Sequence, residues 1–186
     1  QVPLALLDAP WLEGKIVMLE PRRLAARAAA TFMAKSLGEE AGDTIGYRMR
    51  FETRVSARTR IEVVTEAILT RMLQDDASLD GIGALVFDEY HERNLHADLG
   101  LALALETQAQ LRPELRILVM SATLDGERIA RHLDAPRITS PGRSFPVDIG
   151  YFAERAPEDW RMHARRAVQA ALADTDGDVL VFLPGK

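Results

Sequence analysis

Short apolar segments that alternate with helical stretches are the feature that most constrains the fold of this chain. Strand-like segments cover residues 15–20, 59–64, 85–87 and 115–120, and helix-like stretches cover 24–37, 65–73 and 97–111. Neighbouring parallel strands need a crossover of a dozen or more residues, which a helix usually supplies. The alternation therefore predicts a three-layer α/β domain, in which helices cover both faces of a mostly parallel sheet.

The length of the chain and the positions of its prolines and glycines indicate one domain and the start of another. At 186 residues and 47% hydrophobic composition, the chain can bury one sizeable core. Beyond Arg137, prolines and glycines interrupt the regular pattern. We expect a first domain over residues 1–150, and over 151–186 a linker with a helix at 160–172 and a strand at 179–183.

Composition excludes several classes of protein. The formal net charge of -5 argues against a uniformly basic surface, although it allows a local basic stripe. Cysteine is absent, which rules out disulfides and thiolate metal sites. The longest apolar stretch, residues 99–105, is too short to cross a bilayer, and no signal-peptide pattern begins the chain. We expect a soluble, cytoplasmic protein.

Two adjacent acids, Asp88 and Glu89, follow the apolar segment 85–87. In open α/β sheets, ligands bind at the carboxyl ends of the strands. One carboxylate there can hold Mg²⁺, which prefers oxygen ligands, while its neighbour orients a water toward a γ-phosphate. The pair therefore predicts phosphoryl transfer to water. The alternative is that the pair is incidental, because apolar strands that end in two acids are common.

Further short segments stand in a characteristic order along the chain. They are Pro21-Arg22-Arg23, Gly46-Tyr47-Arg48-Met49-Arg50-Phe51-Glu52, Thr65-Glu66-Ala67-Ile68-Leu69, Asp88-Glu89-Tyr90-His91, Arg112-Pro113-Glu114-Leu115, Ser121-Ala122-Thr123 and Gly142-Arg143-Ser144-Phe145-Pro146-Val147. Together they resemble the DEAH branch of the superfamily 2 helicases, and most closely its bacterial members. The resemblance implies a RecA-like, P-loop NTPase domain followed by a second one, with ATP and Mg²⁺ in the cleft between them. It also implies a single nucleic-acid strand, most simply RNA, bound across the top.

The resemblance implies a role for each residue of the acid motif and of the later Ser-Ala-Thr segment. Asp88 would hold Mg²⁺ through water, Glu89 would position the hydrolytic water, and His91 would link the nucleotide site to the strand-binding side. Ser121 and Thr123 would couple hydrolysis to domain movement by exchanging hydrogen bonds with His91 or the acids. A simpler role for both hydroxyls is to cap the helix that follows.

Arginines are the residues that we expect to contact nucleic acid. Arg22, Arg23 and Arg27 stand where a strand gives way to a helix, so their side chains and the first helical amides could meet phosphates. Such contacts do not depend on base sequence, and they imply binding to a backbone.

A second set of candidates is more ambiguous. Thr65 and Glu66 match another strand-contacting segment of the family, although Ala67 stands where glycine is usual and its methyl group could crowd a close approach. A second group of arginines could face either the nucleic acid or solvent, and comprises Arg48, Arg50, Arg54, Arg58 and Arg60.

The phosphate-binding loop of such enzymes has no counterpart in this sequence. No Gly-x-x-x-x-Gly-Lys-Ser/Thr pattern occurs, and the resemblance places that loop just before a segment like Gln1-Val2-Pro3. We therefore expect a fragment of an ATP-dependent nucleic-acid helicase that is inactive without its loop and second RecA-like domain. The alternative is a nucleic-acid-binding clamp or scaffold without ATP turnover.

Overall fold

The computed structural model describes residues 1–122, 126–140, 142, 145–151 and 159–183. The chain divides into two compact units, Gln1–Ile138 and Thr139–Lys186. Within the described residues, all strands belong to the first unit, where they form a single six-stranded sheet.

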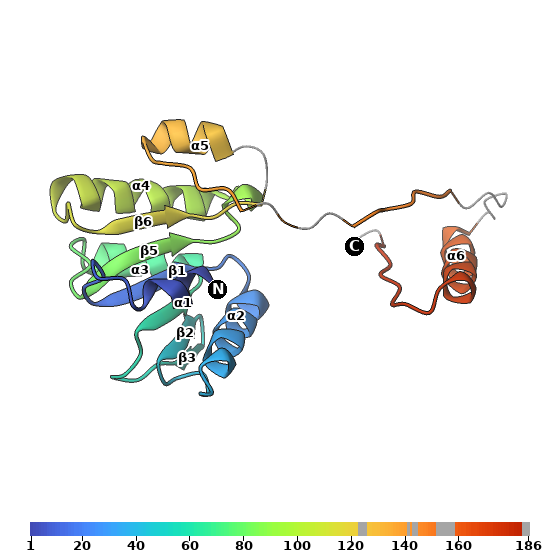
Figure 1. Ribbon diagram of the computed structural model, residues 1–186, viewed down its shortest axis with the longest axis horizontal. Helices are drawn as coiled ribbons and strands as arrows, with labels where there is room; N and C mark the ends of the chain where they lie inside the picture. Colours follow the sequence, from blue (N-terminus) through green and yellow to red (C-terminus); the bar gives the residue numbers. More distant parts are fainter. Residues whose placement is uncertain (123–125, 141, 143–144, 152–158, 184–186) are drawn as a thin grey trace. The chain divides into compact units, whose positions relative to one another are not determined.

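The sheet of the first unit is parallel except at one edge. Its order is β3-β2-β4-β1-β5-β6, and only the β2–β3 pair is antiparallel. The strands are β1 (Lys15–Leu19), β2 (Ile45–Met49), β3 (Glu52–Arg54), β4 (Ile61–Val64), β5 (Ile82–Phe87) and β6 (Arg116–Val119). The carboxyl ends of five parallel strands therefore lie along one edge, which we call the carboxyl edge (Figure 1).

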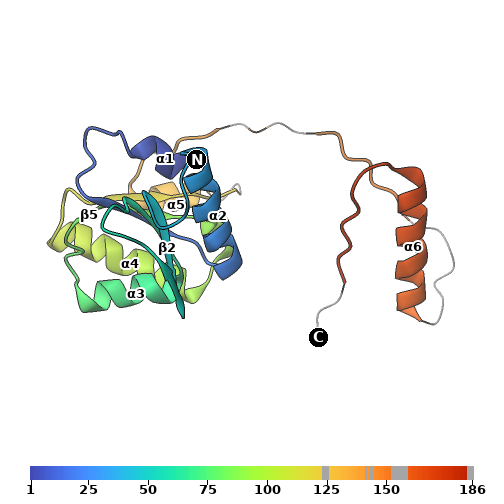
Figure 2. The same cartoon turned by 90° about the horizontal axis from the view of Figure 1, so that it is seen from below.

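Helices cover both faces of this sheet (Figures 1 and 2). The helices are α1 (Val2–Leu6) and α2 (Arg23–Ser36) on one face, and α3 (Glu66–Asp75), α4 (Leu95–Gln110) and α5 (Gly126–Leu133) on the other. Alternate residues of a strand point to opposite faces. Accordingly, Ile16 and Met18 join the core under α2, whereas Val17 and Leu19 join the core under α3 and α4. Because both faces are covered, every residue of β4 and β5 is buried.

The predicted α/β architecture is confirmed, with element bounds that differ by a few residues. Two details differ. A threonine directly before a helix predicts a side-chain cap, but the hydroxyl of Thr65, the N-cap residue of α3, makes no capping hydrogen bond. The hairpin of β2 and β3 was not predicted, and it extends the sheet beyond β4.

The second unit contains one helix among its described residues, α6 (Trp160–Asp174), close to the predicted 160–172. The Asp159 side chain caps it by accepting a hydrogen bond from the Arg161 backbone N–H at 2.9 Å. The strand predicted at 179–183 is wrong, because those residues form no strand. A strand is defined by hydrogen bonds to a neighbour, and the described part of this unit offers no other strand. Among the described residues, no helix has the length and apolarity needed to cross a membrane.

Candidate functional site

The carboxyl edge brings together residues from three adjacent central strands. Leu19 at the end of β1 stands in register with Val64 of β4 and with Phe87 of β5. The ladder continues by one step, since the Glu20 N–H donates to Val64 O at 2.9 Å and the Asp88 N–H donates to Leu19 O at 3.0 Å. Glu20 and Asp88 therefore stand side by side, as the alternation of β1 and β5 predicts for residues on one face.

Glu20 is a buried acid that was not among the predicted site residues. The sequence indicated only that it stands at the end of a strand. It is 5% exposed. Burial and the neighbouring carboxylates of Asp88 and Glu89 raise its pKa to about 7, against the opposing effect of a hydrogen bond from the Arg22 backbone. An acid at the last position of an apolar strand, directly before a proline, was the signal available in the sequence.

The residues that follow β5, Asp88–Glu92, form what we call the acid turn. The Glu89 backbone is left-handed, with φ of 49°, and its N–H donates to Asp88 Oδ1 at 2.9 Å. Residues Tyr90–Glu92 then make a short 3-10 helix, η1. The Glu89 side chain is 45% exposed, so its carboxylate can reach a ligand at the edge.

His91 joins the acid turn to the segment after β6. Its Nε2 lies 3.3 Å from Glu89 Oε2, and its Nδ1 accepts a hydrogen bond from the Ala122 N–H at 3.3 Å. A ring nitrogen that accepts carries no proton, so in the neutral imidazole the proton is on Nε2, which faces Glu89. His91 therefore contacts both Glu89 and the segment after β6, and its role in linking the nucleotide site to the strand-binding side stays a prediction.

Ser121 and Ala122 lie next to the acid turn because β5 and β6 pair directly. The Met120 N–H donates to Phe87 O at 2.8 Å, and the Tyr90 N–H donates to Met120 O at 3.1 Å. Ser121 is exposed at this position. Thr123, its predicted partner in coupling, lies outside the described residues.

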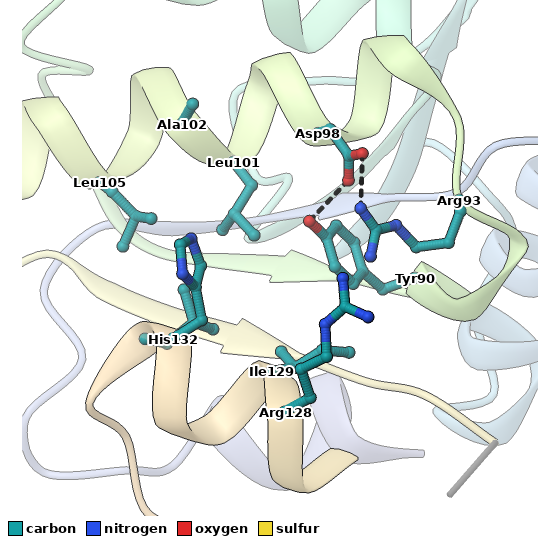
Figure 3. Close-up of a pocket in the computed structure, with 10 residues that line it drawn as sticks. Tyr90, Arg93, Asp98, Leu101, Ala102, Leu105, Arg128, Ile129 and His132 are labelled. Carbon is teal, nitrogen blue, oxygen red and sulfur yellow. Dashed lines mark hydrogen bonds and ion pairs between the residues drawn. The ribbon is translucent and has the colours of Figure 1, made fainter. Parts of the chain in front are cut away.

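Tyr90 anchors the acid turn to α4. Its hydroxyl donates to Asp98 Oδ1 at 2.7 Å, and Arg93 Nη2 lies 2.9 Å from Asp98 Oδ2. Burial, together with the hydrogen bond to Asp98, raises the pKa of Tyr90 to about 12. Figure 3 shows these three side chains at one end of a cavity of about 430 Å³ between α4 and α5. The acid turn is therefore fixed to the first turns of α4.

Two of the three arginines predicted to contact phosphate have carboxylate partners within the chain. Arg22 precedes α2 and pairs with Glu92: its Nε donates to Oε2 at 3.2 Å, and its Nη2 donates to Oε1. Arg27 donates to Glu52. Arg23 begins α2 and is exposed.

Thr65 and Glu66 lie at the carboxyl end of β4, next to Glu20 in the strand order. Thr65 is only 8% exposed. Glu66 accepts a hydrogen bond from the side-chain amide of Asn94. The oxygen of that amide accepts from the Ala97 N–H at 2.9 Å and so caps α4. Asn94 was missed, although an asparagine directly before a helix is a recognisable N-cap signal.

The second arginine group is divided by the structure. Arg50 lies at the carboxyl edge, in the turn between β2 and β3, with its guanidinium carbon 4.7 Å from the Phe51 ring centroid. Phe51 itself is 87% exposed and has a φ of 68°. By contrast, Arg58 pairs with Asp43 at the amino ends of β4 and β2, and Arg48 pairs with Glu62 at 2.7 Å.

The acids of the edge fit a magnesium ion that is bound chiefly by its substrate. Within the described residues, no group of three or more acids and histidines is arranged to enclose a metal ion. Mg²⁺ in nucleotide sites usually takes one or two carboxylates and completes its shell with phosphates and water. Asp88 supplies the single carboxylate that this mode of binding needs.

Comparison with known proteins identifies relatives in sequence and in structure. No family model matches the chain. It is 49% identical over 185 residues to the ATP-dependent RNA helicase HrpB of Escherichia coli, which spans 99% of this chain. The crystal structure of the Escherichia coli DEAH/RHA helicase HrpB matches it with a TM-score of 0.92 over 100% of this chain. The chain is homologous to part of HrpB.

The relatives are much longer than this chain. It spans 23% of the HrpB sequence and 24% of the chain in that crystal structure. The ATP-dependent RNA helicase HrpA of Escherichia coli is 37% identical over 181 residues, which is 14% of its length. The resemblance to DEAH helicases inferred from the sequence is confirmed, and it applies to about a quarter of HrpB.

Proposed function

We propose that this chain is the first RecA-like part of an HrpB-like, ATP-dependent RNA helicase, and that ATP and Mg²⁺ bind at the carboxyl edge. Residues 1–150 would be that domain, and 151–186 a linker with the start of a second RecA-like domain. The observation that carries the proposal is the acid turn at the carboxyl edge, with His91 bridging Glu89 and Ala122. The cytoplasmic location expected from the sequence stays a prediction.

Each acid has a position suited to its proposed role. Asp88 extends β5 at the edge and would hold Mg²⁺ through water, and that ion would neutralise charge on the phosphates. Glu89 projects from a left-handed backbone with a partly exposed carboxylate, so it can orient an attacking water. The Nε2 atom of His91 lies 3.3 Å from that carboxylate and would help to orient it.

Coupling to movement would pass through the segment after β6. A change in the hydrogen bonding of Glu89 alters the contact of His91, and His91 accepts directly from Ala122. Ser121 lies beside that contact, and we keep Thr123 as its proposed partner. A shift at the acids would thereby reach the chain beyond β6.

Nucleic acid would cross the same edge. Arg22, Arg23 and Arg27 offer guanidinium groups for a phosphate backbone. Thr65 and Glu66 stay proposed contacts from the end of β4. The exposed Phe51 adds a ring on which a base can stack, because stacking on aromatic side chains is a general mode of single-strand binding.

The test is ATP turnover by the full-length protein, with and without single-stranded RNA or DNA. We expect RNA to stimulate hydrolysis, and Glu89→Gln to bind ATP while hydrolysing it at least about a hundredfold more slowly. Glu106→Gln, on an exposed face of α4, is the matched control and should behave as wild type. An unimpaired Glu89→Gln variant would remove the catalytic role of Glu89. RNA binding without any hydrolysis by the wild type would favour the clamp instead.

A further inference from the structure

The guanidinium of Arg22 is already engaged by a carboxylate from a distant part of the sequence. Arg22 and Glu92 are separated by 70 positions, yet both oxygens of Glu92 meet the Arg22 fork. A phosphate group would present two oxygens to the same fork in the same bidentate manner. Glu92 therefore fills the position that a nucleic-acid phosphate would take.

The pair is exposed enough to exchange partners. The Arg22 side chain is 70% exposed and that of Glu92 is 28% exposed. Solvent-exposed ion pairs contribute little net stability, because water screens the charges and two long side chains lose freedom. A phosphate that brings additional contacts along a strand can therefore replace Glu92.

Glu92 is also the last residue of the acid turn. Its N–H donates to Glu89 O at 2.9 Å, so one turn of 3-10 helix joins it to the proposed catalytic acid. The Arg22–Glu92 pair consequently ties the start of α2 to the backbone of Glu89. Loss of the pair removes one restraint on that turn.

We propose that Arg22–Glu92 is an exchangeable ion pair, in which a nucleic-acid phosphate displaces Glu92 from Arg22 and releases the acid turn from α2. This inference rests on the proposed function, since it names how strand binding would be sensed at the ATP site. Two ligands that compete for one group are linked reciprocally. Any change that draws Glu92 away from Arg22 must therefore favour binding of the strand.

A double-mutant cycle on RNA binding tests this competition. The full-length protein is titrated without nucleotide against a fluorescent single-stranded RNA, and the Kd is measured by anisotropy. Glu92→Gln removes the competitor, and we expect RNA to bind about 1.5- to 5-fold more tightly, which is the range for loss of an exposed ion pair. Arg22→Gln should weaken binding. In the Arg22→Gln background, Glu92→Gln should have no further effect.

A matched control is available at the amino ends of the strands, opposite the carboxyl edge. Asp43→Asn breaks the exposed Arg58–Asp43 pair at the amino ends of the strands and removes one negative charge. It should leave the Kd unchanged.

Three results are decisive against the inference. If Glu92→Gln tightens binding equally in the Arg22→Gln background, the effect is a general one of charge, and the exchange is wrong. Suppose that the wild type binds RNA and hydrolyses ATP. If Glu92→Gln then leaves the affinity for RNA unchanged or lowers it, only this inference fails. If the wild type does not bind RNA, the proposed function fails as well.

Discussion

Replacement of Glu20 by glutamine should stabilise the first unit at neutral and alkaline pH. Glu20 is buried beside Asp88 and Glu89, and its pKa is raised from 4.5 to about 7. A carboxyl whose pKa is higher in the folded state than in the unfolded state favours folding most when it is protonated. Its contribution to stability is fully present below pH 4.5 and is lost as the pH rises through about 7.

The size of the effect follows from that difference in pKa. Each pKa unit corresponds to about 1.4 kcal/mol, so the rise from 4.5 to about 7 gives an upper limit of about 3.5 kcal/mol for the charge on Glu20 above pH 8. Water at the open carboxyl edge screens the neighbouring acids, so we expect about 1–2 kcal/mol. Glutamine has nearly the same shape and no charge. The variant should therefore match wild type near pH 4 and exceed its stability at pH 8.

Urea denaturation of the 186-residue chain, followed by far-UV circular dichroism at pH 4 to 8.5, measures this difference. Glu106→Gln serves as control, because Glu106 is exposed and its replacement should leave the pH dependence unchanged. Parallel stability curves for wild type and Glu20→Gln over this range would refute the argument, since they would show that Glu20 does not hold a raised pKa in the folded chain.

Two other substitutions test separate parts of the site. Phe51→Ala should weaken binding of single-stranded RNA by about 1–3 kcal/mol in an anisotropy titration, the range for loss of one stacked base. It should leave thermal stability unchanged because the ring is exposed, and equal affinity for wild type and variant would exclude stacking. Asn94→Ala should lower the free energy of unfolding by about 1 kcal/mol through loss of the α4 cap. Asn94→Ser, which keeps an acceptor for the Ala97 N–H without placing a second carboxylate beside Glu66, should retain most of that stability, and an equal loss in both variants would contradict the capping role.

Local patterns in the sequence were enough to predict the main architecture. The apolar segments 15–20 and 85–87 and the helix formers that follow them specify strands and helices largely by themselves, and β1 and β5 lie where expected. The position of Asp88 and Glu89 at the carboxyl edge also follows, because it needs only the direction of one strand. Parallel pairing then brings Ser121 beside them.

The features that the sequence did not reveal depend on contacts between segments far apart in the chain. The environment of Glu20 depends on β1 lying next to β5, and the partner of Arg22 stands 70 positions away. The β2 segment lacks clear alternation, and the turn at Phe51 needs a positive φ that a phenylalanine rarely adopts. The apolar run 179–183 was mistaken for a strand, since hydrophobicity alone does not supply a hydrogen-bonding neighbour.

The central place of β1 sets the distance over which the two halves of the edge can influence each other. Adjacent strands lie about 4.8 Å apart, so Thr65 at the end of β4 and Asp88 at the end of β5 are separated by about 10 Å. That separation is comparable to the Debye length at physiological ionic strength, about 8 Å. Protein atoms also occupy part of the space between the two residues and keep salt ions out of it. A polyanion arriving on one side and a metal-bound triphosphate on the other would therefore sense each other's charge directly, before any backbone moves.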